Sequence, residues 1–183
     1  LATIQAKVAV NVDVAPYYVN LAMTTLSSPA PSNVYIDPGY SDGSADVHAF
    51  GYDAFTTIQA GIAAAATGGT INVAAGAYKE NVTVDKALTL TGASSATVTV
   101  TADNPSAHVF NITASNVTIS GFTATGAVGP GGPSYAGMNL VAGVRNSNIH
   151  DNIFTVNQYG ILLVEPLNNL TSGNNTFTSN TDS

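Results

Sequence analysis

The chain has 183 residues, of which 45% are hydrophobic and 8% are charged, and its formal net charge is −7. The basic residues are Lys7, Lys79, Lys86 and Arg145, and their scarcity argues against binding to nucleic acid or to an anionic membrane. No apolar run reaches the length of a membrane span, and the absence of cysteine excludes disulfides and thiolate metal sites. Thr, Val, Asn, Ser and Gly are frequent while Glu, Lys, Arg and Gln are scarce, so the composition predicts β structure.

Residues 1–32 form the first predicted unit, an extended strand arm followed by a linker. Residues 3–14 alternate between apolar and polar side chains, which predicts a strand about 40 Å long at ~3.3 Å per residue. The apolar face carries Ile4, Ala6, Val8, Val10, Val12 and Val14. The arm either ends a preceding domain or packs along its own molecule, or it is donated to a neighbouring subunit. A linker stiffened by Pro29 and Pro31 ends the unit.

A loop rich in Asp and Gly follows a short predicted strand at residues 34–36. The carboxylates of this region are Asp37, Asp42, Asp46 and Asp53. Several oxygen ligands on a flexible loop suit Ca²⁺, although the Glu that closes an EF-hand loop is absent. Asp and Gly are also ordinary turn residues, so the loop predicts either a calcium site or a structural turn. Calcium is the one cofactor that the sequence suggests.

Residues 54–66 predict a helix, with Asp53 as its N-cap residue and a Gly-Gly pair ending it. Phe55, Ile58 and Ile62 recur at helical spacing and give the helix one apolar face. Such a face suits a helix that covers the open end of a larger core.

Short apolar alternations recur along most of the chain after this helix. Alternation predicts strands with one buried face, and the tight corners between these strands predict a solenoid. Leu90, Ile119 and Ile149 align at steps of 29 and 30 residues, and Phe154 aligns with Phe177 at a step of 23. Steps of this size predict one supersecondary unit per turn, with Asn-rich corners whose side chains stack from turn to turn.

Three short motifs lie between residues 54 and 82. They are Ala54-Phe-Thr-Thr-Ile-Gln-Ala-Gly-Ile62, Gly68-Gly-Thr-Ile71 and Gly76-Ala-Tyr-Lys-Glu-Asn-Val82. Together they resemble the start of right-handed parallel β-helix proteins of the pectate lyase and pectin methylesterase superfamily, which open with a short capping helix and a Gly-x-Tyr-x-Glu element. The resemblance implies an all-β, right-handed parallel β-helix over residues 33–183, with its capping helix at about 54–66. The superfamily includes lyases, esterases, hydrolases, epimerases, adhesins and surface-layer proteins, so the resemblance implies no single function.

The catalytic motifs of that superfamily do not occur in this sequence. The Gly-x-x-Asp-Phe-Ile-Phe-Gly element of pectin methylesterases is absent, and there is no Trp for their Arg-x-Trp motif. Arg145, His150 and Asp151 form one small set suited to charge neutralisation and proton transfer, with Glu165 as a fourth candidate one coil further on. The other interpretation is that these four are solvated residues of polar corners.

Other residues carry weaker signals for surface functions. His48 and His108 are isolated in sequence and no metal-ligand spacing links them. The possible N-glycosylation sites are Asn81, Asn111, Asn116, Asn169 and Asn174. Tyr40 and Tyr135 lie in predicted loops and are the better candidates for stacking on sugar rings.

We expect this chain to be a non-catalytic structural or adhesive module that is secreted and self-assembles into a surface layer, sheath or filament. The shortage of catalytic residues, the strand arm, and the lack of a capping pattern in residues 176–183 favour this function. One alternative is the N-terminal part of a carbohydrate-active enzyme, either a polysaccharide lyase or a pectinesterase-like protein. Another is a calcium-dependent glycan-binding module.

Overall fold

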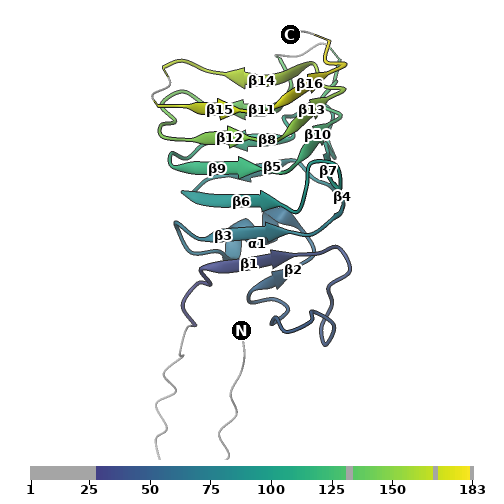
Figure 1. The fold of residues 1–183 in the computed structure, drawn as a ribbon, viewed down its shortest axis with the longest axis vertical. Helices are drawn as coiled ribbons and strands as arrows, with labels where there is room; N and C mark the ends of the chain where they lie inside the picture. The colour runs from purple at the N-terminus through teal and green to yellow at the C-terminus, as the bar shows by residue number, and fades with distance from the viewer. Residues whose placement is uncertain (1–27, 131–133, 167–168, 182–183) are drawn as a thin grey trace, which may run out of the picture.

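The computed structural model describes residues 28–130, 134–166 and 169–181. The described residues are mostly β, with three parallel sheets and one helix, α1 (Ile58–Ala64). Figure 1 shows the strands stacked along the long axis, from β1 and β2 at the lower end to β14, β15 and β16 at the upper end. The prediction of an all-β protein is therefore confirmed.

Each sheet is built from strands that lie far apart in the sequence. The first sheet, in the order β15-β12-β9-β6-β3-β1-β2, contains β1 (Asn33–Ile36), β2 (Ala54–Phe55), β3 (Thr70–Val73), β6 (Leu88–Gly92), β9 (Val117–Ser120), β12 (Asn148–His150) and β15 (Thr171–Gly173). The second sheet, in the order β16-β13-β10-β7-β4, contains β4 (Gly76–Lys79), β7 (Val98–Thr101), β10 (Thr123–Thr125), β13 (Ile153–Thr155) and β16 (Thr176–Thr178). The third sheet, in the order β14-β11-β8-β5, contains β5 (Val82–Val84), β8 (Phe110–Ile112), β11 (Ala136–Leu140) and β14 (Tyr159–Leu163).

From β3 onward the chain visits the three sheets in rotation. We call three consecutive strands, one from each sheet, a circuit. Each strand pairs in parallel with the strand of the same sheet in the next circuit, as β3 does with β6, β4 with β7 and β5 with β8. The core therefore runs along the axis of the stack, between the three sheets.

Columns of apolar side chains fill this core. Leu90 is in register with Ile71 and Ile119, and Ile119 with Ile149; all four side chains are at most 1% exposed. Phe154 pairs in the same way with Phe177. These pairs confirm the steps of 29, 30 and 23 residues read from the sequence. Between inward positions the strands place Thr, Asn and Ser outward, which suits β-branched and small polar side chains on a half-exposed pleated surface.

Left-handed backbone conformations recur at the corners. Asn116, Asn146 and Asn169 have φ of 59°, 52° and 53°, a region that Asn tolerates better than most residues. Their side chains are stacked: Nδ2 of Asn146 donates to Oδ1 of Asn116 at 3.2 Å, and Nδ2 of Asn169 donates to Oδ1 of Asn146 at 3.1 Å. The predicted stacking of corner asparagines is confirmed for this column.

The helix begins later than the sequence predicts. Residues 54 and 55 form β2, which pairs with β1, and α1 starts after Thr57, whose side chain accepts a hydrogen bond from the N–H of Ala60. The assignment of Asp53 as the N-cap residue is wrong, because its carboxylate accepts the N–H of Ala49 at 2.6 Å instead. Phe55 lies at helical spacing from Ile58 and Ile62, but it pairs with Ile36 of β1 as part of a strand instead of joining the helix.

The Gly-x-Tyr-x-Glu element fixes the start of α1. Glu80 accepts the N–H of Ile58 at 2.9 Å and that of Gln59 at 3.0 Å, one with each carboxylate oxygen. A negative charge beside unpaired N–H groups at a helix start is favourable. The Tyr78 hydroxyl donates to the Ala74 carbonyl at 2.9 Å from a buried position.

Two further side chains attach α1 to the third sheet. The Gln59 amide pairs with the backbone of Thr83, accepting its N–H at 2.8 Å and donating to its carbonyl at 3.3 Å. The Lys86 ammonium donates to the carbonyls of Ala63 and Ala65 at 3.2 and 3.1 Å, where a cation complements the helix C-terminus. The helix is thus bound at both ends and along its side.

The predicted strand arm, with its proposed assembly residues Ile4, Val8, Val10, Val12 and Val14, lies outside the described residues. Within the described part of the chain, no helix has the length and apolar character needed to cross a membrane.

Candidate functional site

The structure brings together two of the four predicted catalytic candidates. His150 ends β12 and Asp151 follows it, with His150 Nδ1 2.6 Å from Asp151 Oδ2. The side chains are 33% and 55% exposed. Hydrogen bonds from His150 and from Asn174 hold the pKa of the Asp151 carboxyl below its ordinary value. The two side chains form a partly exposed hydrogen-bonded pair at an outer corner.

The other two candidates are placed elsewhere. Arg145 lies in the exposed turn before β12, where its N–H donates to Ser115 Oγ at 3.0 Å and its carbonyl accepts the N–H of Asn116. The ion pairs of the described residues do not include Arg145. Glu165 lies in the loop after β14. Among the described residues, no hydrogen bond or ion pair joins Arg145 to His150 or Asp151, and a catalytic role for the four stays a prediction.

Two of the four predicted calcium ligands, Asp37 and Asp53, accept backbone N–H groups in loop turns. Asp37 Oδ1 accepts the N–H of Gly39 at 2.8 Å, while Asp53 caps Ala49 and lies 3.4 Å from His48 Nδ1. Across residues 28–130, 134–166 and 169–181, no three His, Cys, Asp or Glu side chains form a group that could hold a metal ion. Calcium binding remains a prediction from the sequence alone.

All five glycosylation candidates make hydrogen bonds to other side chains or to the backbone. Asn81 donates to the carbonyls of Asn104 and His108, and Asn111 accepts from Asn139. Asn116 and Asn169 belong to the corner stack described above, and Asn174 bonds to Asp151. These asparagine side chains join one circuit to the next, and their glycosylation stays an untested prediction.

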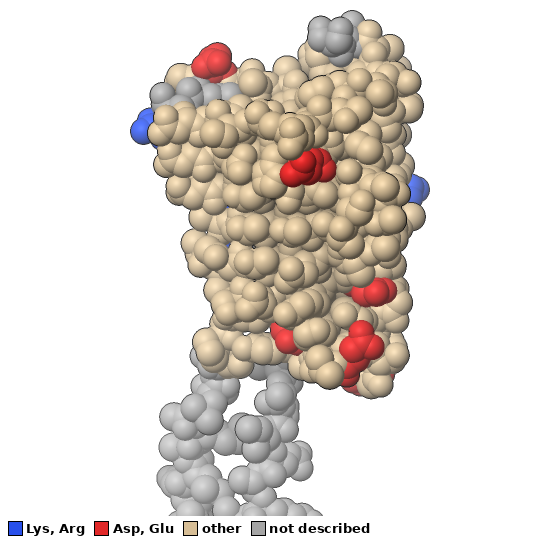
Figure 2. Space-filling view, in the orientation of Figure 1, with Lys and Arg blue, Asp and Glu red and all other residues tan. Residues whose placement is uncertain are grey.

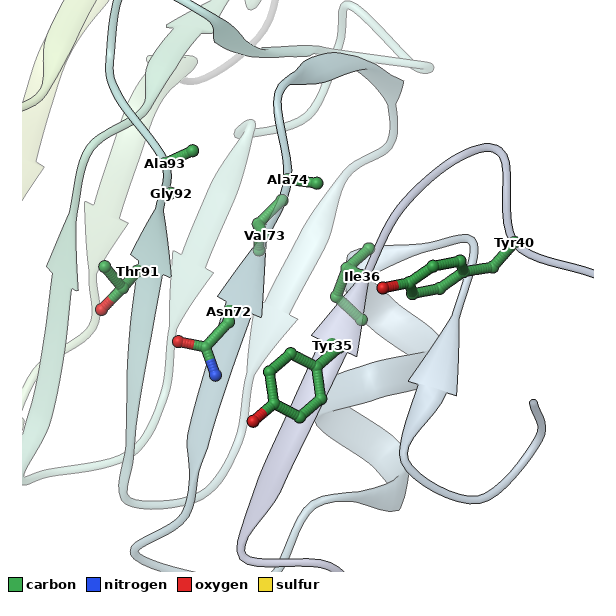
Figure 3. A pocket seen from close by; sticks show the side chains of 9 residues that line it. All are labelled: Tyr35, Ile36, Tyr40, Asn72, Val73, Ala74, Thr91, Gly92 and Ala93. Carbon is green, nitrogen blue, oxygen red and sulfur yellow. The ribbon is translucent and has the colours of Figure 1, made fainter. Parts of the chain in front are cut away.

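The hollow with the clearest binding geometry lies at the carboxyl ends of β1, β3 and β6. Its volume is about 270 Å³, and we call it the aromatic hollow (Figure 3). It is lined by Tyr35, Ile36, Tyr40, Asn72, Val73, Ala74, Thr91, Gly92 and Ala93. Figure 3 shows Tyr40 reaching from its loop toward Ile36, with Tyr35, Asn72 and Thr91 following one another across the strands.

Strand register explains this row of side chains. Tyr35 pairs with Asn72 and Asn72 with Thr91, so the three project from the same outward position of successive strands, about 4.8 Å apart. The remaining lining residues, Ile36, Val73, Ala74, Gly92 and Ala93, are apolar or small, and among them the Ile36 and Val73 side chains are buried in the core at 1% and 2% exposed. The hollow therefore has both polar and apolar lining residues.

The edge of the aromatic hollow is built by the loop after β1. His48 stacks on Tyr35 with ring centroids 3.7 Å apart and 21° between the planes, and its Nδ1 faces Asp53. Burial raises the pKa of the Tyr40 phenol, and the negative charges of Asp46 and the other loop carboxylates raise it further. Tyr40 is therefore a neutral hydrogen-bond donor at neutral pH.

Sequence reasoning located only part of this hollow. Tyr40 was correctly singled out as a loop aromatic, but Tyr135 lies elsewhere, with its ring 6.4 Å from that of His108. His48 is not isolated, because it stacks on Tyr35. The signal that was missed is the recurrence of polar side chains at one outward position of β1, β3 and β6. A comparison of the chain with known protein families, with curated proteins and with solved structures finds no match.

Proposed function

We propose that this chain is a non-catalytic structural module of a cell-surface or secreted assembly, which self-associates through the end of the stack formed by β14, β15 and β16. We further propose that the stack is a right-handed parallel β-helix of the pectate lyase-like type, with α1 as the cap of its other end. The contacts of Glu80, Thr83 and Lys86 with α1 support the assignment of a cap.

The observation that carries this proposal is the exposure of inward-facing residues at one end. Leu163 is in register with the fully buried Leu140, and Phe177 with the fully buried Phe154. Leu163 and Phe177 are nevertheless 44% and 51% exposed, because no described strand lies beyond them. Each sheet also ends here in an edge strand, whose unpaired backbone groups favour pairing with another chain.

The chemistry of this end favours a second copy of the chain as its partner. Residues 159–164 and 169–181, which contain β14, β15 and β16, include no charged side chain. Two copies with a net charge of −7 each could therefore meet through strands that carry no charged side chain, although Glu165 lies in the loop just after β14. A like-to-like contact of this kind is isologous and closes as a pair. Larger assemblies need a second contact, for which the arm at residues 3–14 is our proposal.

The test is sedimentation velocity of the full chain over a wide range of concentration. We expect reversible association that Leu163→Lys abolishes, because the new charge lies at the centre of the contact. Val128→Lys is the matched control: Val128 is also about half exposed, at 50%, but lies in the loop after β10. A wild-type chain that stays monomeric throughout, or equal effects of both variants, contradicts the proposal.

Deleting residues 1–15 tests the role of the arm separately. If the arm joins pairs into larger assemblies, the truncated chain stops at pairs, while electron microscopy of the full chain shows filaments or sheets. Filaments that persist in the truncated chain would show that the arm is not the second contact.

A further inference from the structure

We propose that the aromatic hollow binds a single amino-sugar ring, with the ammonium group directed toward the carboxylates of Asp37, Asp46 and Asp53. This site is independent of the end-to-end contact proposed above, since it lies at the opposite end of the stack, beside β1 (Figure 1).

The size of the hollow suits one ring. Small-molecule sites typically occupy about 300–1,000 Å³, and the volume of about 270 Å³ lies just below this range. Small residues keep the space open, because Ala74, Gly92 and Ala93 form much of its wall. Gly92 is also required for packing, since a Cβ there would lie 2.2 Å from the Gly121 carbonyl oxygen.

The walls provide both kinds of contact that a sugar ring uses. Tyr35, held in place by the stacked His48, and Tyr40 offer aromatic surface. Asn72 Oδ1, Thr91 Oγ1 and the Tyr40 hydroxyl make no hydrogen bond with the described residues. They remain available to sugar hydroxyls as acceptors and donors.

The charge around the hollow favours a cation. Residues 28–78 contain no Lys or Arg, whereas Asp37, Asp46 and Asp53 all act electrostatically on Tyr40. On the face that Figure 2 shows, several red carboxylates lie at the lower end, with others higher up, and the visible blue basic groups lie away from the lower ones. An ammonium group gains from these carboxylates and from the faces of the Tyr rings, whereas a neutral hexose gains only the ring contacts and the hydrogen bonds to its hydroxyls.

The experiment is an NMR titration of the full chain with glucosamine, at a pH where its amine is protonated, and with glucose. We expect glucosamine to shift the backbone amides of Tyr40, Asn72 and Thr91 and to bind at least about threefold more tightly than glucose, as one nearby unit charge in a solvated site predicts. Added salt should reduce this difference.

Two isosteric variants separate the local charge from the net charge. Asp46→Asn removes a carboxylate beside the hollow, and Asn tolerates the φ of 56° at this position. Asp103→Asn makes the same charge change at the exposed ion pair with Lys79. We expect about threefold weaker glucosamine binding in the first variant and no change in the second.

Four results would overturn the proposal. Equal affinity for glucose and glucosamine excludes the role of the ammonium group, and equal weakening by both variants excludes a local charge effect. Nα-acetyl-lysine methyl ester carries an ammonium group but no sugar ring. If it binds as tightly as glucosamine, the site is not specific for the ring. The absence of shifts at Tyr40, Asn72 and Thr91 at saturating ligand excludes the site itself.

Discussion

Asn152 and Asn157 make the same pair of hydrogen bonds at the two ends of β13. Oδ1 of each accepts a backbone N–H of the preceding circuit at 3.1 Å, and Nδ2 of each donates to a carbonyl of that circuit, at 3.0 Å for Asn152 and 2.9 Å for Asn157. Both residues are at most 1% exposed. Asn175 and Asn180 repeat the arrangement one circuit later. Each amide therefore replaces a stretch of strand pairing where the chain turns a corner.

Replacing Asn152 by Ala should lower the free energy of unfolding by about 2–4 kcal/mol, because a buried donor and a buried acceptor lose their partners. The equivalent Asn175→Ala should cost less, because Asn175 is only half-buried in the last described circuit and water can replace its bonds more readily. Chemical denaturation of both variants measures the difference. Equal costs would contradict the importance of burial.

Val156 has φ of 54°, a left-handed conformation that is strained for a β-branched residue. The same corner position is Gly126 one circuit earlier and Ser179 one circuit later, with φ of 90° and 54°. Val156→Asn should therefore raise the stability by about 1 kcal/mol, since half of the Val side chain is already exposed. Val128→Asn, at a similarly exposed residue outside this corner column, is the control and should change the thermal midpoint little. A loss of stability in the first variant would argue against strain.

Glu80 neutralises the start of α1, and Glu80→Ala leaves the N–H groups of Ile58 and Gln59 without their acceptor. We expect a loss of about 1–3 kcal/mol in the free energy of unfolding, with reduced helical signal in circular dichroism. Asp42→Ala removes an exposed carboxylate in the loop after β1 and controls for net charge. An unchanged stability in Glu80→Ala would show that water serves these donors equally well.

His108 should make stability depend on pH near neutrality. Its Nδ1 accepts the N–H of Ala136 at 3.1 Å, and burial lowers the pKa of its imidazole below the ordinary 6.5. The unfolded chain therefore binds a proton more readily, so stability is full above about pH 6.5 and falls as the pH drops from there through the folded pKa. Urea denaturation between pH 7.5 and about 5 measures this loss, and His108→Gln should remove that part of the slope. An identical slope in the variant would assign the effect to other groups.

Asp151 contributes in a lower pH window; its pKa is also lowered, but by hydrogen bonds rather than by burial. Because its pKa is held below the ordinary 3.8, its stabilising contribution is present above that value and is lost as the pH falls through the folded pKa. The two effects are separated by comparing His108→Gln with Asp151→Asn across the acid range. Asp151→Asn should change only the more acidic part of the curve.

The repeating part of the fold was open to prediction from sequence. The alternations at β3, β5 and β6 place one apolar face inward, and the steps between Leu90 and Ile149 agree with the strand register. A strand that is buried on one face alternates apolar and polar residues with a period of two, so it can be recognised from its own short stretch of sequence. β4 was less visible because only Tyr78 among its residues points into the core.

The start of α1 and the aromatic hollow were harder to predict for a different reason. Both depend on partners distant in sequence: β2 forms by pairing with β1, and the hollow needs Tyr35, Asn72 and Thr91 in register. No local pattern around His48 indicates that it stacks on Tyr35. Contacts made by a loop that folds back on a sheet become apparent only when the sheet itself is known.

The attachment of α1 also determines how the molecule opens. Glu80, Gln59 and Lys86 connect the helix to the first circuit, so releasing the helix exposes that circuit at the same time, whereas β16 is bonded only to β13. Amide hydrogen exchange should therefore be graded along the axis, slowest near β3 and β6 and fastest in β15 and β16. The molecule would then fray from one end, one circuit at a time, rather than open uniformly.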